Sequence, residues 1–420
     1  MIFVYKFLTL FLYPLFIFII YVRKIFGKED SIRFKEKIFL SSIQVSRVKS
    51  KKLIWFHAAS IGEIQSIKNL IEYYHKNGYE ILITTVTKTA AQLVKDKILK
   101  NDLIHHRYFP IDVTFLIRKF LNTWSPNLII FVDSEIWPNL MTEIKKKNIR
   151  SLIVNARITK KTYDKWILFS SFSKKIFSIF DLCLTANNET LTFLKNLQAK
   201  NVKHFGNLKL SNSSPGSLQK GVNKDILTKK KFWCAVSTHK GEDSFFVKTH
   251  LKLKEKIKNI ITIIIPRHIN RSYQIKNEIQ KLNLKVQVVN RDDKIDENKE
   301  ILIINSFGNL NGYLNNAKSI FMGKSLLKRF RNTGGQNPIE AAKLGCKIYH
   351  GPYVYNFTDI YKKLGQLNIS KEILNESDLA TNIIEDFNTP KIRDLKSIEV
   401  IDKVGRDILQ KTIREINKLL

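Results

Sequence analysis

The chain contains few cysteines for its length. Only three of its 420 residues are cysteine, and Cys183, Cys234 and Cys346 lie far apart in the sequence. They form neither a C-x-x-C pair nor a cysteine/histidine spacing typical of a metal site, and an odd number cannot make a closed disulfide framework. A redox or zinc function is therefore a poor interpretation, and we expect buried thiols in a reducing compartment.

Acidic residues are also scarce. Lys and Arg number 71 against 37 Asp and Glu, which gives a formal net charge of +34. Such an excess describes the partners of a protein rather than its fold, and it admits nucleic acid, anionic lipid and phosphorylated substrates alike. The hydrophobic share of 44% and the charged share of 26% exclude both a wholly disordered chain and a polytopic membrane protein.

Several common motifs are missing. The chain has no Walker lysine pattern and no G-x-G-x-x-G fingerprint, so ATPase and dinucleotide-binding functions are poor interpretations. It has no solenoid-length repeat and no low-complexity tract. Its length fits two domains of ordinary size.

The first residues form a long apolar run. Residues 2–22 are almost wholly apolar, with Lys6 as the only charge, and about 20 residues cross a hydrocarbon core. Arg23, Lys24 and Lys28 follow, and no A-x-A cleavage site is present. These features favour an uncleaved anchor at residues 1–24, with its C-terminal side in the cytoplasm, over a signal peptide. Pro14 leaves open a monotopic helix that lies in the membrane interface.

Beyond this segment, apolar runs of strand length alternate with amphipathic stretches such as residues 64–75 and 89–99. The runs are residues 53–57, 79–87, 128–135, 149–157, 182–187, 202–209, 232–237, 260–266, 285–290, 301–306, 319–323 and 346–351. This alternation predicts parallel sheets covered by helices on both faces, an α/β fold. A linker rich in Ser, Asn and Gly at 211–224 predicts two Rossmann-like domains, at 30–210 and 225–420, that face a cleft.

Two acidic segments follow strands of the first half. Ser60 and Glu63 have the spacing of a capping box, and Glu63 is alternatively a base for a sugar hydroxyl. Asp133 and Glu135 lie at the end of the apolar run at residues 128–135 and precede Pro138, which is suited to begin a helix. Two acids at a strand end favour acid/base or cation-binding chemistry, with helix capping as the alternative.

Three further segments suit an anionic ligand. Lys209 is suited to contact one as a point charge, with a solvated surface lysine as the alternative. Arg267, at a strand end, is suited to bind a phosphate or to pair with a surface acid. The glycine pair at 334–335 precedes a helix expected near Pro338, and Glu340 there either contacts ribose hydroxyls or compensates the helix dipole.

In their order along the chain, these segments resemble the motifs of the bacterial Kdo (3-deoxy-D-manno-octulosonic acid) transferases. The matching segments are residues 57–63, 134–139, 206–209, 237–239, 266–268 and 334–340, so the resemblance covers nearly the whole chain. It implies a GT-B glycosyltransferase that inverts the anomeric centre and uses no metal and no cofactor. It also implies transfer of Kdo from CMP-Kdo to lipid IVA, the lipid A precursor, in lipopolysaccharide core biosynthesis at the cell inner membrane, beside anionic lipids.

The resemblance implies a role for individual residues as well. Glu63 is the general base for the acceptor hydroxyl, and Glu135 and Lys209 stabilise the transition state. The residues implied to bind CMP are Pro266, Arg267, Gly308, Asn309, Leu310, Asn337, Pro338, Ile339 and Glu340. The chain departs from the family pattern at Gln336, where a histidine is usual, and at Asn305, Asn309 and Lys324, so its differences lie on the donor side.

Two other functions are compatible with parts of the sequence. One is a GT-B transferase that uses a UDP-sugar on a membrane lipid. The other is a membrane-tethered protein that binds nucleic acid through its positive charge. The basic and aromatic run at residues 229–233 leads into a predicted buried strand, so it does not present a stacking surface and no nucleic-acid partner is expected.

Overall fold

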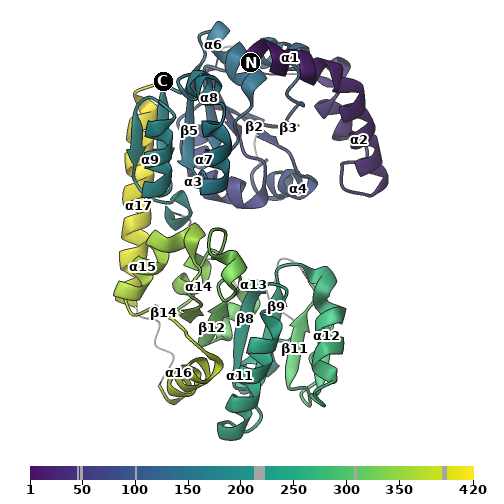
Figure 1. Ribbon diagram of the computed structural model, residues 1–420, viewed down its shortest axis with the longest axis vertical. Helices are drawn as coiled ribbons and strands as arrows, with labels where there is room; N and C mark the ends of the chain where they lie inside the picture. Colours follow the sequence, from purple (N-terminus) through teal and green to yellow (C-terminus); the bar gives the residue numbers. More distant parts are fainter. Residues whose placement is uncertain (45–46, 48–50, 100–101, 212–222, 307–309, 390–394) are drawn as a thin grey trace. The chain divides into compact units, whose positions relative to one another are not determined.

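The computed structural model describes residues 1–44, 47, 51–99, 102–211, 223–306, 310–389 and 395–420. Its internal contacts divide the chain into unit 1, Met1–Asn212 with Lys403–Leu420, and unit 2, Ser213–Asp402 (Figure 1). The sequence instead predicted a C-terminal domain that runs from 225 to 420. Most of the predicted linker at 211–224 lies outside the described residues.

Unit 1 is built on a seven-stranded sheet in which all neighbouring strands are parallel. The strands are β1 (Leu53–His57), β2 (Glu80–Thr85), β3 (Ile104–Tyr108), β4 (Leu128–Val132), β5 (Arg150–Ala156), β6 (Leu182–Thr185) and β7 (Val202–His204). Their order is β3-β2-β1-β4-β5-β6-β7. The sequence order therefore reverses between β1 and β4, which makes their carboxyl ends the switch point of the sheet.

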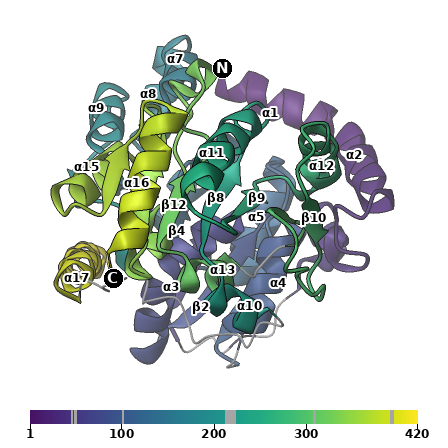
Figure 2. The same cartoon turned by 90° about the horizontal axis from the view of Figure 1, so that it is seen from below.

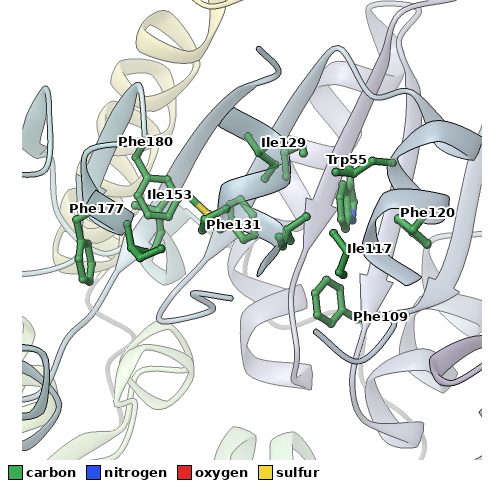
Figure 3. Packing of buried hydrophobic residues seen from close by; sticks show 14 of the residues in the cluster. Trp55, Phe109, Ile117, Phe120, Ile129, Phe131, Ile153, Phe177 and Phe180 are labelled. Carbon is green, nitrogen blue, oxygen red and sulfur yellow. The ribbon is translucent and has the colours of Figure 1, made fainter. Parts of the chain in front are cut away.

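Helices between the strands cover both faces of this sheet. They are α3 (Ile61–Lys76), α4 (Lys88–Lys97), α5 (Thr114–Trp124), α6 (Pro138–Lys146), α7 (Lys160–Ile167), α8 (Ser170–Phe177) and α9 (Asn188–Asn196), with short 3-10 turns η1 (Arg33–Lys37), η2 (Leu40–Ser42) and η3 (Leu208–Ser211). Trp55, Phe120 and Phe131 belong to a core between sheet and helices, which Figure 3 shows from close by. Every residue of β1 and β4 is buried, as expected for central parallel strands.

The predicted anchor forms two helices rather than one. They are α1 (Ile2–Phe11) and α2 (Tyr13–Ile25), and the axis bends by 54° between them. No single helix among the described residues is long and apolar enough to cross a membrane, whereas this bent pair taken together meets the requirements of length and composition.

The end of the long helix α17 (Leu395–Asn417) packs on unit 1. Glu415 pairs with Lys203 of β7 at 2.6 Å, and Tyr74 of α3 donates a hydrogen bond to Asn417 at 2.9 Å. A side chain at Gly405 would lie 2.2 Å from the carbonyl oxygen of Leu210, so glycine is needed for this close approach. These contacts are why residues 403–420 belong to unit 1 and not to the predicted C-terminal domain.

Unit 2 repeats the same plan. Its strands are β8 (Phe232–Thr238), β9 (Ile261–Pro266), β10 (Val286–Val289), β11 (Ile301–Ile304), β12 (Ser319–Met322), β13 (Lys347–His350) and β14 (Ser370–Glu372), in the parallel order β10-β11-β9-β8-β12-β13-β14. Its helices are α10 (Lys224–Lys229), α11 (Asp243–Lys256), α12 (Ser272–Gln280), α13 (Leu310–Asn316), α14 (Ile339–Lys343), α15 (Thr358–Gln366) and α16 (Glu376–Asn388), with η4 (Ile269–Arg271), η5 (Lys328–Phe330) and η6 (Tyr355–Phe357). Helices α11 and α16 lie side by side on one face of the sheet (Figure 2).

One buried contact occurs in both units. The indole N–H of Trp55 donates to Thr84 on the neighbouring strand at 2.8 Å, and Trp233 donates to Thr262 in the same way at 2.8 Å. A buried indole needs such a partner. Each pair ties the first strand of its sheet to the second.

The predicted alternation of strands and helices in two Rossmann-like parts is confirmed. Twelve of the observed strands coincide with predicted apolar runs, although the run at 202–209 divides into β7 and η3. Strands β3 and β14 were missed. In β3 the sequence Ile-His-His-Arg-Tyr carries polar side chains at three positions, and β14 has only three residues.

Candidate active site

The two predicted carboxylates meet at the switch point of unit 1. Glu63 lies in the first turn of α3, directly after β1, and Glu135 lies in the loop between β4 and α6. Because β1 and β4 are neighbours in the sheet, both residues follow adjacent carboxyl ends. This is the edge at which open α/β sheets bind ligands.

The Glu63 carboxylate is held by two local donors. Its Oε2 accepts the backbone N–H of Ala59 at 2.7 Å, and its Oε1 accepts the hydroxyl of Ser60 at 2.6 Å. Ser60 is the N-cap residue of α3, but its side chain makes no capping hydrogen bond to the helix. The reciprocal capping box is therefore not formed, and Ser60 instead holds the carboxylate in place.

Burial raises the pKa of Glu63 from 4.5 to about 7. The negative charges of Glu135 and Asp133 contribute to this increase, whereas the hydrogen bonds from Ser60 and Ala59 oppose it. A carboxylate with a pKa near the working pH is suited to accept a proton and release it again. The alternative of a simple helix cap does not account for this environment.

Glu135 is joined to the end of β1 by His57. The imidazole Nε2 of His57 lies 3.3 Å from Oε2 of Glu135, and Nδ1 lies 2.9 Å from the Thr84 hydroxyl. The same Thr84 hydroxyl accepts the indole N–H of Trp55 at 2.8 Å. The indole N–H of Trp137 lies 3.2 Å from Oε2 of Glu135 and 3.2 Å from Nε2 of His57, so these three side chains meet at one point.

Lys209 lies among these acids rather than on the open surface. It is half-buried within η3, and its Nζ would lie 3.9 Å from a β-carbon added at Gly62, next to Glu63. Burial lowers the pKa of Lys209, and the charges of Asp133 and Glu63 oppose that effect. Lys209 is therefore not the solvated surface lysine that the sequence left open.

Asp133 and Arg157 complete the charges of this site. Asp133 has a left-handed backbone with φ of 62°, which is uncommon for a residue other than glycine. Burial raises the pKa of Asp133, whereas the charges of Lys209 and Arg157 lower it. Three carboxylates thus share the site with two cations, so protonation of one group affects the others.

In unit 2, cationic groups gather where strands end. His239 follows β8, Arg267 follows β9 and Lys324 lies after β12. Burial lowers the pKa of His239 to about 4, and the positive charges of Lys324, His268, Arg267 and Arg271 add to the effect. The Arg267 side chain is exposed, so it is accessible to an anionic ligand.

Glu242 links the loops that follow two of these strands, β8 and β12. It is fully buried, and its carboxylate accepts backbone N–H groups of His239, Lys324, Ser325 and Leu326 at 2.8–3.2 Å. The loops after β8 and β12 are thereby held against each other. The Gln336 side chain reaches the same place, with Nε2 at 3.4 Å from Nε2 of His239.

The segment predicted to bind CMP next to the glycine pair is only partly accessible. Helix α14 follows Pro338 as predicted, but Pro338 and Ile339 are buried. Glu340 is exposed. A side chain at Gly334 would lie 2.1 Å from the carbonyl of Tyr353, so this glycine serves packing within the chain and not the approach of a ligand.

The remaining predicted donor residues are unevenly placed. Pro266 ends β9 and is buried, and the Asn337 side chain accepts the N–H of Ile339 at 3.2 Å. Leu310 begins α13, whereas Gly308 and Asn309 lie outside the described residues. The described part of the chain contains no group of three His, Cys, Asp or Glu residues that could hold a metal ion.

Sequence reasoning assigned no role to four residues that shape these sites: His57, Arg157, His239 and Glu242. His57 and His239 occupy corresponding places, at or just after the end of the first strand of each sheet, and that repetition was a usable signal. Arg157 and Glu242 act through partners distant in sequence, so no local pattern marks them.

Comparison with known proteins supports one family. A family model described as 3-deoxy-D-manno-octulosonic-acid transferase (kdotransferase) matches residues 33–212. The 3-deoxy-D-manno-octulosonic acid transferase of Rickettsia bellii is 30% identical over 400 residues, which cover 94% of this chain and 93% of the relative.

Solved structures match most of the length of the chain. A putative UDP-N-acetylglucosamine 2-epimerase from Listeria monocytogenes covers 88% of this chain and 97% of its own, with a TM-score of 0.59 and 10% identity. A glycosyltransferase from Rickettsia africae covers 88% and 98%, with a TM-score of 0.57 and 12% identity. At such identities the likeness concerns the fold alone, and the predicted GT-B fold is confirmed.

Proposed function

The chain belongs to the 3-deoxy-D-manno-octulosonic acid transferase family, and from that premise we propose that it transfers Kdo from CMP-Kdo to lipid IVA. Membership in the family makes it a glycosyltransferase. The donor, the acceptor and the place in lipopolysaccharide core biosynthesis belong to the proposal. The single observation that carries it is the carboxylate of Glu63, which has a pKa of about 7 and lies at the switch point of unit 1.

In the proposed reaction, Glu63 is the general base. An acceptor hydroxyl attacks the anomeric carbon of Kdo while its proton passes to the Glu63 carboxylate. The bond from that carbon to the phosphate oxygen breaks, and CMP leaves with the bonding electron pair. Attack on the face opposite to CMP inverts the anomeric centre. No metal or cofactor is needed for this balance of atoms and charge.

Glu135 and Lys209 adjust the electrostatics of the same step. Lys209 is the nearby cation, and it favours the ionised form of Glu63 that is able to accept the proton. Glu135 raises the proton affinity of Glu63, and His57 and Trp137 hold its carboxylate in place. Because these side chains are held in fixed positions, they need little reorganisation as charge shifts during the reaction.

We assign the donor to unit 2. Arg267 presents an exposed guanidinium at the end of β9, which suits the phosphate of CMP. Lys324 adds a second positive charge near His239, and the neutral imidazole is available as a hydrogen-bond partner. Gln336 stands where the family has a histidine, and its amide preserves hydrogen bonding without a titrating group.

The proposed acceptor determines where in the cell the protein works. Lipid IVA is a membrane lipid, so we propose that the protein works at the cytoplasmic side of the cell inner membrane. The apolar residues of α1 and α2 and the basic residues that follow them support contact with anionic lipids.

A donor screen with the full chain tests the proposal. Lipid IVA is incubated with CMP-Kdo, with UDP-glucose or with UDP-N-acetylglucosamine, and the lipid is analysed by mass spectrometry. Addition of Kdo from CMP-Kdo alone is expected. Addition of a hexose or N-acetylhexosamine from a UDP-sugar, without reaction of CMP-Kdo, would overturn the donor assignment in favour of another GT-B activity.

A further inference from the structure

Helix α1 turns its polar side chains toward unit 1 and its apolar ones outward. Tyr5, Lys6 and Thr9 are buried or half-buried on the inner side. The exposed side chains of α1 and α2 include Phe3, Phe7, Leu8, Phe11, Leu15 and Phe18. A helix on the surface of a water-soluble domain has the opposite arrangement, with polar residues outside. The exposed side of this helix pair is therefore suited to an apolar surrounding.

Three side chains of α1 end on buried polar groups of unit 1, and one of them, Lys6, pairs with Glu143 of α6 at 3.5 Å. The Tyr5 hydroxyl donates to Oδ2 of Asp112 at 3.0 Å, and Thr9 accepts from Nδ2 of Asn139 at 3.0 Å. Asp112 is 6% exposed and Asn139 is fully buried. We call Tyr5, Thr9, Asp112 and Asn139 the polar latch. Figure 1 shows α1 beside α6, where these contacts lie.

The polar latch also fixes the beginning of α6. The Asp112 carboxylate accepts the backbone N–H groups of Asn139 and Leu140, each at 2.9 Å, and these are in the first turn of the helix. The residue before that turn is Trp137, whose indole N–H points at Glu135. The segment that carries Glu135 is thus held at one end by β4 and at the other by the polar latch.

We propose that the exposed side of α1 and α2 lies along the surface of an anionic phospholipid membrane, and that α1 positions the Glu135 segment there through the polar latch. The role of Glu135 in this proposal rests on the proposed function. Tyr5 and Thr9 are positioning residues, because they act through Asp112 and Asn139 and touch no substrate.

The contacts of the latch favour a helix in the plane of the membrane. A straight helix across the bilayer would withdraw Tyr5 and Thr9 from unit 1 and leave Asp112 and Asn139 without these partners, which is costly for buried polar groups. A helix pair in the interface keeps the contacts and buries the exposed apolar side in lipid. Lys28 is exposed just after α2, where it suits anionic headgroups, whereas the exposed Arg23 pairs through Nε with Glu29 at 2.6 Å.

Depth measurements test the placement. A nitroxide label is attached to single cysteines introduced at Phe7, Phe11 and Phe18 of the full chain, whose own cysteines are buried, on phosphatidylglycerol/phosphatidylethanolamine vesicles. The same shallow depth of about 5–10 Å is expected for all three labels. A spanning helix would instead separate the labels at positions 7 and 18 by about 16 Å of depth. Labels that stay unimmersed while the protein forms dimers would identify a second copy as the occupant. Either of these results overturns the proposal.

A matched pair of variants tests the positioning role. Tyr5→Phe removes the hydroxyl that bonds Asp112, whereas Tyr13→Phe removes one that bonds the carbonyl of Ile38, away from α6. With deacylated, water-soluble lipid IVA as acceptor, Tyr5→Phe is expected to lower kcat about tenfold with an unchanged KM for CMP-Kdo. Hydrogen exchange at the amides of Asn139 and Leu140 is expected to accelerate to a similar degree. The control changes neither.

The two readouts separate this proposal from the proposed function. If Tyr5→Phe leaves both kcat and amide exchange at the native values, α1 is only a tether and the positioning role is wrong. If the native protein transfers no Kdo, the proposed function fails. Amide exchange at the start of α6 then still shows whether α1 holds that helix.

Discussion

His57 Nε2 lies 3.3 Å from Oε2 of Glu135, so the imidazole that ends β1 meets the carboxylate that follows β4. This contact joins the two central strands of unit 1 at the point where the strand order reverses. Glu63 follows the same β1 and responds to the charge of Glu135. The site is therefore a coupled set of groups, and its expected behaviour follows from that coupling.

The first prediction concerns the pH dependence of transfer. Only ionised Glu63 accepts a proton, so kcat is expected to rise with pH around a midpoint near 7. In Glu135→Gln the negative charge that raises the pKa of Glu63 is removed, so the midpoint moves to lower pH, whatever the remaining rate. A pH–rate profile of both proteins measures this. An unchanged or higher midpoint in Glu135→Gln would show that the two carboxylates are not coupled.

The second prediction concerns stability. Because the pKa of Glu63 is raised from 4.5 to about 7 in the folded protein, the stability it contributes is fully present below pH 4.5 and is lost as the pH rises through about 7. Glu63→Gln avoids this loss. The difference in free energy of unfolding between Glu63→Gln and the native protein is expected to increase between pH 4.5 and about 7 and to stay constant above that. The total increase is up to about 3 kcal/mol. Denaturant titrations at pH 5 and pH 8 check it, and an equal difference at both pH values contradicts it.

The third prediction concerns Lys209. Lys209→Met removes a positive charge that favours the ionised forms of Asp133 and Glu63, so kcat falls about 10–100-fold and the pH midpoint moves upward. Lys200→Met is the matched control, because Lys200 is exposed. Steady-state kinetics over a range of pH measure both effects. A loss of activity without a shift in the midpoint would assign Lys209 to substrate binding instead.

How much of this site was predictable depends on the distance between the partners in sequence. Glu63, Glu135 and Lys209 each lie at or after the end of a predicted strand, but the strand pattern did not bring Lys209 to the two acids. The pairing of β1 with β4, the contact of His57 with Glu135 and the inward turn of Lys209 depend on partners 70 residues or more apart, which no local pattern encodes. The capping-box spacing of Ser60 and Glu63 was real, but burial redirected the Ser60 hydroxyl to the carboxylate.

Prediction of the fold from the sequence was limited in the same way. Runs of Ile, Leu and Val marked the buried central strands, whereas β3 contains His105, His106 and Arg107 and was missed. The last residues of α17 pack on unit 1 because Gly405 allows close approach to Leu210. Such an approach is a property of two distant segments, so composition alone placed residues 403–420 in the wrong domain.

The fourth prediction concerns the donor. Arg267→Ala is expected to raise the dissociation constant for CMP about tenfold and to weaken its dependence on salt, because an exposed guanidinium contact with phosphate is lost. Arg291→Ala is the control, since Arg291 is also an exposed arginine of unit 2. Calorimetric titration with CMP at low and high salt measures the difference. Equal affinities of the two variants would remove Arg267 from the donor site.

The proton transfer to Glu63 is tested most directly by the rate of Kdo addition to lipid IVA in Glu63→Gln, followed by mass spectrometry. Glu72→Gln is the matched control, because Glu72 is on the exposed side of the same helix and pairs with Lys68 at 3.5 Å. We expect Glu63→Gln to bind CMP normally and to transfer Kdo about 10²–10⁴-fold more slowly, while the control matches the native protein. Transfer by Glu63→Gln at the native rate would contradict the assignment of Glu63 as the base.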